Sequence, residues 1–212
     1  MGYRTVADVR RVGVLIDYQN TYNDARETFH DPKVDPARWG NVKPVQFARL
    51  LAGKGPGRYD LTYIGVYCGM PDSSSDPKGF AAQRRRVAAW EKEGSTVRSR
   101  TLRYPPAWAM KQGEKPREKG VDVQLALDAV VKSIEGVFDT IIIASTDTDL
   151  DALVEALLEI QKTTGKPTGV EAVAWYKRSN TLKQVPGLAL RWIGPNDYKT
   201  VRDDNDYNQS TQ

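Results

Sequence analysis

The apolar and polar positions of the chain predict strands and helices that alternate for most of its length. Short apolar or alternating runs predict strands at residues 12–16, 60–68, 95–102, 141–144, 170–175 and 188–193. Apolar residues at helical spacing predict helices at residues 45–51, 80–93, 122–134, 150–164 and 179–185, and a short helix near Thr21. This alternation is typical of an α/β fold, here a three-layer α/β/α sandwich with a mainly parallel central sheet.

For two segments the sequence also predicts which residues are buried or exposed. The helix at residues 122–134 has an apolar stripe that we expect to face the core, formed by Val123, Leu127, Val130 and Ile134. From Gly194 onward the chain is polar and is expected to fray. We therefore expect one domain over residues 11–193 and a polar C-terminal tail over residues 194–212.

Composition narrows the class of protein. The chain has 212 residues, of which 40% are hydrophobic and 27% charged, as in soluble globular domains. No apolar run approaches the roughly 20 residues that cross a bilayer, and the N-terminus lacks the apolar segment of a signal peptide. We expect a cytoplasmic protein with no membrane partner. The single Cys68 excludes an internal disulfide and a cysteine-based zinc site, and the single His30 stands in a polar stretch that favours a surface loop.

Charge is unevenly distributed along the chain. Residues 1–120 carry 22 basic against 13 acidic side chains, and residues 121–212 carry 9 against 14. The basic excess is greatest at residues 76–119, with 12 basic against 5 acidic side chains. A basic surface beside an acidic centre suits a polyanionic substrate. Charge alone favours the simpler interpretation of a solvated surface.

Carboxylates and hydroxyls are concentrated at residues 145–149, Ser-Thr-Asp-Thr-Asp, between a predicted strand and the next helix. Ligands of open α/β sheets bind at the carboxyl ends of the strands. The like charges of Asp147 and Asp149 repel unless a cation or protons intervene, which suggests a divalent-metal site. The alternative is that Thr148 or Asp149 caps the helix and Asp147 is a solvated turn residue.

Two further acids stand where they can join this site. Asp17 follows the strand at residues 12–16 directly, and Asn20, one turn later, can orient a water or a phosphate and hydrogen-bond Asp17. Asp122 lies in the first turn of its helix, where the helix dipole also favours a carboxylate. Both Asp17 and Asn20 are alternatively helix caps. Four carboxylates without Cys or His ligands suit Mg²⁺ or Mn²⁺ rather than zinc.

The basic region includes a proline-rich stretch at residues 104–119 that contains Tyr104 and Trp108. Aromatic side chains among Arg and Lys can stack bases and neutralise phosphates, although a plain basic loop has the same composition. The side chains that we expect to bind nucleic acid are Arg84, Arg85, Arg98, Arg100, Tyr104, Trp108, Lys111, Arg117 and Lys119.

Three blocks of residues resemble a known family when taken together. They are Asp17-x-x-Asn20, then Lys119-Gly120-Val121-Asp122-x-x-Leu125-x-x-Asp128, then Ser145-x-Asp147-x-Asp149-Leu150. In order and spacing, over residues 11–193, they resemble the NYN domain in its LabA-like (DUF88) branch, within the PIN-like nuclease superfamily. Many relatives carry Gly at the position of Thr146 and an aromatic residue at that of Leu150.

The resemblance implies a PIN-like fold and metal-dependent hydrolysis of RNA phosphodiester bonds, favouring an endonuclease that cuts single-stranded or structured RNA. It implies that Mg²⁺ or Mn²⁺ is held by Asp17, Asp122, Asp147 and Asp149. Asn20 and Ser145 would be supporting catalytic residues. A homodimer or a regulatory protein partner is compatible with such a domain.

Two other functions stay open on the sequence. One is a nucleic-acid-binding or regulatory protein that keeps the fold but has little or no turnover. The other is a phosphatase of the haloacid-dehalogenase type, because Asp147-Thr148-Asp149-Leu150-Asp151 loosely matches a D-x-D-x-T nucleophile motif. That motif requires Thr or Val where Asp151 stands, and it normally follows the first strand of its fold.

Overall fold

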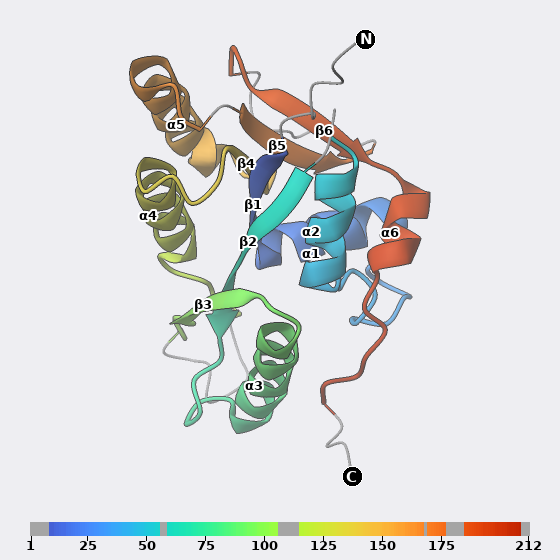
Figure 1. The fold of residues 1–212 in the computed structure, drawn as a ribbon. Helices are drawn as coiled ribbons and strands as arrows, with labels where there is room; N and C mark the ends of the chain where they lie inside the picture. The colour runs from blue at the N-terminus through green and yellow to red at the C-terminus, as the bar shows by residue number, and fades with distance from the viewer. Residues whose placement is uncertain (1–8, 56–58, 106–114, 168, 177–184, 209–212) are drawn as a thin grey trace.

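A computed structural model describes residues 9–55, 59–105, 115–167, 169–176 and 185–208. Within these residues the strands form one sheet, all of whose neighbouring pairs are parallel, in the order β3-β2-β1-β4-β5-β6. The strands are β1 (Arg10–Asp17), β2 (Tyr59–Met70), β3 (Thr96–Thr101), β4 (Thr140–Ala144), β5 (Gly169–Trp175) and β6 (Ala189–Ile193), as Figure 1 shows. The predicted parallel sheet is confirmed.

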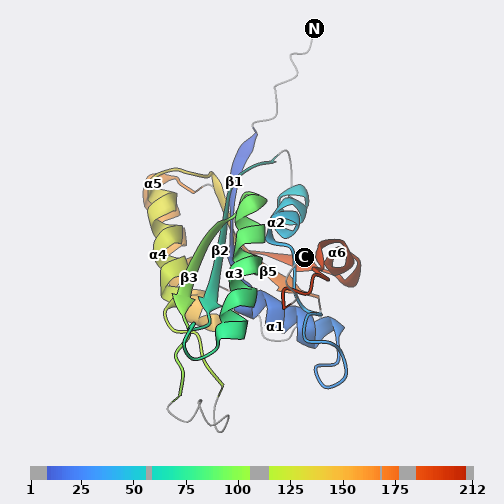
Figure 2. The ribbon, with the colours of Figure 1, turned by 90° about the horizontal axis from the view of Figure 1, so that it is seen from below.

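Helices cover both faces of this sheet. They are α1 (Tyr18–Phe29), α2 (Pro44–Gly53), α3 (Pro77–Lys92), α4 (Val121–Ile134), the 3₁₀ turn η2 (Thr148–Leu150), α5 (Asp151–Thr164) and α6 (Pro195–Val201). Helices α4 and α5 lie on one face, and α1, α2, α3 and α6 lie on the other (Figure 2). The predicted three layers are confirmed. The helix expected at residues 179–185 falls almost entirely outside the described residues. No helix in the described part of the chain is long and apolar enough to cross a membrane.

Strand β1 shows how the pleat builds two cores. Val14 and Ile16 pack with side chains of α1, α2 and α6, whereas Leu15 packs with side chains of α4 and α5. On that second face a Cβ at Gly13 would come within 2.2 Å of the Phe138 ring, so the absence of a side chain lets Phe138 pack against the strand. Because both faces are buried, the central strands are continuous apolar runs.

The predicted core stripe of α4 is wrong at three of its four positions, and the fourth, Val130, is partly buried against the core. Val123, Leu127 and Ile134 are 56%, 57% and 69% exposed, and the buried residues of the helix are Val121, Leu125, Ala129 and Ser133. The helix is apolar on two opposite sides, so its periodicity fits either face equally well. Gly120 precedes the helix at φ 76°, a left-handed conformation that favours glycine and fixes the direction in which α4 enters.

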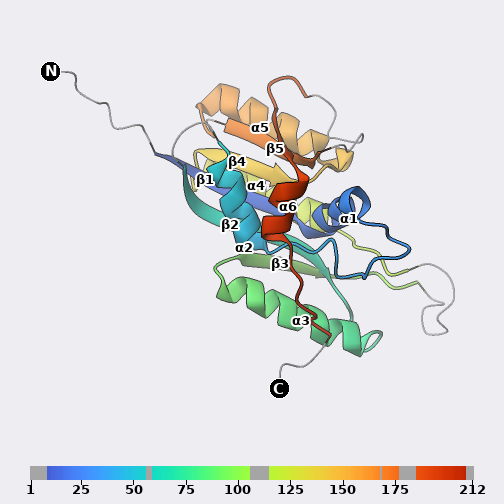
Figure 3. The same ribbon diagram turned by 90° about the vertical axis from the view of Figure 1, so that its right-hand side faces the viewer.

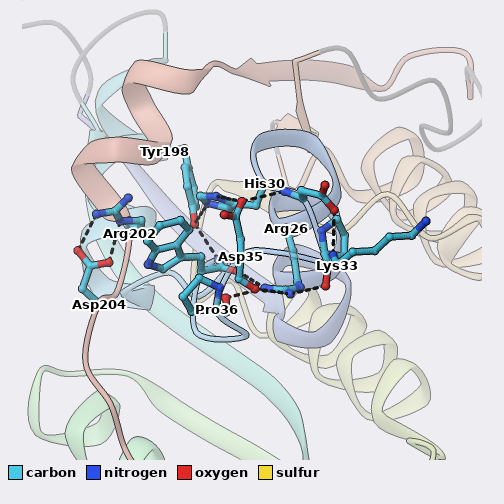
Figure 4. Close-up of polar contacts among 12 residues, drawn as sticks. Arg26, His30, Lys33, Asp35, Pro36, Tyr198, Arg202 and Asp204 are labelled. Atoms are coloured by element: carbon cyan, nitrogen blue, oxygen red, sulfur yellow. Dashed lines mark hydrogen bonds and ion pairs between the residues drawn. The ribbon is translucent and has the colours of Figure 1, made fainter.

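The expectation that the chain frays from Gly194 is also wrong within the described residues. Helix α6 buries Tyr198 and Val201 against the core. The Tyr198 hydroxyl accepts a hydrogen bond from the Gly40 amide (2.8 Å) and pairs with His30 Nε2 (3.0 Å), as Figure 4 shows for His30 and Tyr198. His30 is therefore a partly buried packing residue that links α1 to α6, not a residue of a surface loop.

Candidate active site

The candidate active site lies where the sheet reverses its strand order. From β1 the chain proceeds outward through β2 and β3, and from β4 it proceeds outward in the other direction through β5 and β6. Loops at such a switch point diverge, and ligands of open α/β sheets bind in the crevice between them. Asp17 ends β1, and Ser145 to Asp147 follow β4, so the structure places two of the predicted blocks side by side.

Asp17 occupies the centre of this crevice. It is 8% exposed and caps α1, which therefore begins at Tyr18 and not near Thr21. One carboxylate oxygen accepts a hydrogen bond from the Asn20 amide (3.1 Å), and the other accepts one from the Ser145 hydroxyl (3.2 Å). Burial, with smaller contributions from the negative charges of Asp147 and Asp122, raises the pKa of Asp17 to about 6, although the two hydrogen bonds oppose the rise.

Sequence reasoning missed a further acid, Glu118. It lies just before α4, and its Oε1 accepts a hydrogen bond from the Gly69 amide near the end of β2. Burial raises the pKa of Glu118 to about 7, with contributions from the charges of Asp17 and Asp122. A Cβ on Gly69 would come within 2.8 Å of Oε1, so glycine permits this approach. The signal in the sequence was an acid among three basic residues at positions 115–119.

The loop after β4 is held in place from α1. Asn20 Oδ1 accepts hydrogen bonds from the Thr146 amide (2.8 Å) and the Thr146 hydroxyl (3.3 Å), and that hydroxyl also donates to the buried Asp24. The side chain of Asn20 thus positions the loop. Asp24 was missed, although Asp17, Asn20 and Asp24 share the spacing of one helix face. These bonds give Thr146 a role that the glycine of many relatives cannot fill.

Two of the other three predicted metal ligands lie close enough to Asp17 for their charges to raise its pKa. The charges of Asp122, in the first turn of α4, and of Asp147 both act on Asp17. Asp147 caps η2, accepting a hydrogen bond from the Asp149 amide (3.0 Å), so the capping residue is Asp147 and not Thr148 or Asp149 as the alternative had it. Asp149 itself is exposed on η2.

The oxygen donors of this site suit a hard divalent cation in chemistry. Among the described residues, however, no three Asp, Glu, His or Cys side chains are grouped so that they could hold a metal ion by themselves. Mg²⁺ typically keeps several waters and takes one or two carboxylates together with substrate phosphates. The residues therefore fit an open metal site that substrate completes, and not a closed cage.

Three of the arginines predicted to contact nucleic acid have protein partners, although Arg98 and Arg100 are also exposed. Arg98 pairs with Asp128 (3.5 Å), Arg100 donates to Gln124 (2.6 Å), and Arg85 donates twice to the Tyr207 carbonyl (2.9 and 2.7 Å). Arg84, Arg117 and Lys119 are exposed.

Tyr104 is half-buried, and its hydroxyl accepts a hydrogen bond from the Asp72 amide (3.2 Å). Trp108 and Lys111 lie outside the described residues. Asp128, from the second motif, also accepts a hydrogen bond from the Tyr67 hydroxyl (3.1 Å) and serves to join α4 to the sheet.

Three comparisons with known proteins find a family, a sequence relative and a similar fold. The sequence profile described as the NYN domain matches residues 11–171. CRISPR-associated protein Cas8b from Haloferax volcanii is 34% identical over 107 residues, which cover 49% of this chain and only 14% of that protein. The crystal structure of a protein of unknown function from Vibrio parahaemolyticus superposes with a TM-score of 0.53 and 20% identity, covering 88% of this chain and 96% of that one. That last likeness shows the fold alone.

Proposed function

The chain belongs to the NYN domain family, within the PIN-like nuclease superfamily, and we propose that it is a metal-dependent ribonuclease. We further propose that it belongs to the LabA-like branch and acts in the cytoplasm as an endonuclease. The observation that carries the proposal is the carboxylate of Asp17, which burial and, to a smaller extent, the charges of Asp147 and Asp122 make costly to ionise. A cation would offset that cost, and PIN-like nucleases are generally dependent on divalent metals.

In this proposal Asp17, Asp122 and Asp147 hold Mg²⁺ or Mn²⁺, with Asp149 directly or through a water. A bound divalent ion lowers the pKa of a coordinated water and stabilises charge on the leaving oxygen. The chain's own residues set the geometry. Ser145 fixes one oxygen of Asp17, while Asn20 and Asp24 hold Thr146 and so the loop that carries Asp147.

Glu118 adds a group that can exchange a proton near neutral pH. Its Oε1 is held by the Gly69 amide, and its pKa of about 7 leaves protonated and ionised forms both populated. A general acid or base works best when its pKa lies near the operating pH. We propose that Glu118 moves a proton at Oε2 to or from the attacking water or the leaving oxygen.

The substrate that suits this site is RNA, single-stranded or structured. Exposed cations flank the crevice on α3, on β3 at the edge of the sheet, and at the entry to α4, where Lys119 lies three residues before Asp122. Such side chains neutralise phosphates without selecting sequence. Arg84, Arg98, Arg100, Arg117 and Lys119 are the described cations that we propose for this role, with Tyr104 as a stacking residue. Trp108 and Lys111, which lie outside the described residues, stay part of the proposal.

A second function, nucleic-acid binding with little or no turnover, is favoured by one observation. The described acids do not form a three-acid metal group. The phosphatase hypothesis lacks comparable support, because Asp147 follows β4 and not the first strand of the sheet.

The test is cleavage of an end-labelled single-stranded RNA with Mg²⁺ or Mn²⁺, beside an EDTA control. The parent protein is expected to give products that require both the metal and Asp147, so Asp147→Asn should abolish them while leaving thermal stability nearly unchanged. Asp60→Asn, an exposed aspartate on β2, is the matched control. RNA binding that weakens with salt but yields no products would favour the second function. Cleavage retained in Asp147→Asn would rule out the assignment of this site.

A further inference from the structure

A cavity of about 300 Å³ lies beside the acidic crevice, bordered by α1, the end of β2, α3 and residues 205–208. We call it the α1–α3 pocket. Ligand pockets in proteins run from about 300 to 1,000 Å³, so this one suits a group of the size of a single nucleobase better than a larger molecule. Figure 3 shows how the C-terminal segment descends from α6 to reach α3.

The pocket is continuous with the proposed catalytic residues. Glu118 and Gly69 line it, and the charge of Asp17 acts on Glu118. Tyr18, which also lines the pocket, follows Asp17 directly in the chain. If a phosphate of an RNA strand lies at Asp17, an adjacent nucleotide of that RNA can therefore reach this cavity.

The walls of the pocket combine rings, a guanidinium and amides. The Arg86 guanidinium lies 5.2 Å from the ring centroid of Tyr207 and 6.0 Å from that of Tyr18. The Gln83 side chain is held by two hydrogen bonds: it accepts one from Arg86 Nη1 (3.2 Å) and donates one to Cys68 Sγ (3.5 Å). Amides offer both donors and acceptors, as base edges do, and unpaired bases typically stack on aromatic or guanidinium planes.

The charges of the pocket favour a base over a phosphate. Two cations, Arg38 and Arg86, are balanced by two acids, Glu118 and Asp206, within the same lining. These charges therefore give the lining no net positive charge to hold a phosphate, whereas a neutral base with a polar edge needs none.

The C-terminal wall is fastened in place. Arg85 donates two hydrogen bonds to the Tyr207 carbonyl, and the Tyr207 hydroxyl donates to the buried Asp203 (2.8 Å). Arg85, which the sequence predicted to bind nucleic acid, thus holds this wall of the pocket. The ring of Tyr207 is held beside Arg86 before any ligand arrives, which reduces the entropy that binding must overcome.

We propose that the α1–α3 pocket holds one unpaired nucleobase of the substrate strand, next to the scissile phosphate, and so sets base preference. This inference rests on the proposed ribonuclease function. It assigns Gln83 as a residue that contacts the base edge and Tyr207 as part of the wall on which the base stacks.

The first experiment measures binding to the full chain by calorimetry in EDTA, so that cleavage plays no part. The probes are the four nucleoside 5′-monophosphates, ribose 5-phosphate and a short single-stranded RNA. At least one nucleotide should bind at least about fivefold more tightly than ribose 5-phosphate, since base contacts add hydrogen bonds and stacking. The RNA should compete with that nucleotide. Equal binding of ribose 5-phosphate, no nucleotide binding, or no competition by RNA would overturn the proposal.

The second experiment compares Gln83→Leu with Gln161→Leu, the same substitution on α5, outside the pocket. Gln83→Leu should weaken binding of the preferred nucleotide about two- to tenfold, the worth of about one net hydrogen bond. In a randomised RNA pool it should also flatten base preference at one position beside the cut. Unchanged affinity and preference in Gln83→Leu would overturn the proposal. Cleavage with no base preference would overturn the pocket proposal while leaving the ribonuclease function intact. Nucleotide binding without cleavage would support the pocket and overturn the ribonuclease function.

Discussion

Strands β1 and β4 carry an aspartate at each end of their shared ladder, and the two are treated in opposite ways. At the amino end, Asp139 accepts hydrogen bonds from the Arg11 amide (2.9 Å), Nε (3.2 Å) and Nη2 (2.8 Å), and these contacts lower its pKa. At the carboxyl end, Asp17 is buried among other carboxylates, and its pKa rises to about 6. The same side chain is stabilised as an anion at one end and opposed as an anion at the other.

This contrast separates a structural acid from a candidate functional one. Asp139 has its own cation, and its burial is modest, so its charge helps to join the two strands. Asp17 has hydrogen-bond donors, but the charges that act on it come from Asp122 and Asp147. Perturbed acids in a crevice are typical of functional sites, because folding alone gains nothing from such repulsion. The difference predicts distinct consequences for matched substitutions at the two ends.

The largest expected effect is on catalysis. Asp17→Asn should lower RNA cleavage at least about 100-fold, because loss of residues that only support metal ligands typically lowers activity or metal affinity 10- to 100-fold. Asp139→Asn should cleave at the parent rate. Initial rates with saturating Mn²⁺ would measure both. Equal losses in the two variants would erase the functional distinction between the ends of the ladder.

The next effect is on stability as a function of pH in EDTA. Because the pKa of Asp17 rises from 3.8 to about 6, its stabilising contribution is complete below about pH 4 and is lost as pH rises through 6. Glu118, whose pKa rises from 4.5 to about 7, likewise loses its stabilising contribution as pH rises through about 7. The free energy of unfolding of Asp17→Asn should therefore exceed that of the parent by up to roughly 3 kcal/mol at pH 8, and by little at pH 4.

Urea unfolding at the two pH values would measure this gain. Asp139→Asn should show the opposite sign, because the pKa of Asp139 is lowered: its contribution is present above about pH 4 and lost as pH falls through the lowered value. A constant difference in stability between the parent and Asp17→Asn at both pH values would contradict the assigned cause.

A smaller effect is expected where backbone makes room for Glu118. Gly69→Ala should destabilise the fold by about 1–3 kcal/mol, because its Cβ would come within 2.3 Å of Leu102 and 2.8 Å of Glu118. The matched control is Gly53→Ala at the end of α2, where a Cβ meets nothing within 4 Å. That control should be neutral or slightly stabilising. Thermal unfolding would compare them, and equal melting temperatures would show that the crevice adapts freely.

The smallest effect is expected at the paired end of the ladder. Asp139→Asn should lower Tm by about 2 °C or less at pH 7, because the Arg11–Asp139 pair is partly exposed and screened by water. Calorimetry in low and high salt would measure it, with the difference shrinking at high salt. A large, salt-independent loss would mean that this pair, and not packing, holds β1 to β4.

Sequence periodicity predicted the structure correctly where a segment is buried on both faces, because its pattern then fits only one interpretation. The central strands are apolar throughout because helices cover both faces, and their order in the chain alternates with helices, so the parallel three-layer fold followed. It failed where two interpretations fit. Helix α4 is apolar on two sides, and only packing against the sheet decided that Leu125 and not Leu127 is buried. Helix α6 was missed because its apolar residues are few and its burial depends on distant partners such as Gly40 and His30.

For the candidate site, the sequence by itself determined that acids follow the apolar strands β1 and β4, and the three motif blocks identified their family. Local order along the chain is enough for that, since a carboxylate after a central parallel strand must reach the carboxyl edge of the sheet. Only the tertiary structure decided which groups share the crevice. It brought in Glu118 through the Gly69 amide, left Asp149 exposed, and turned Arg85 toward the C-terminal segment. The reason is physical: pKa values, pairing and burial depend on distances between residues far apart in the sequence, and folding alone sets those distances.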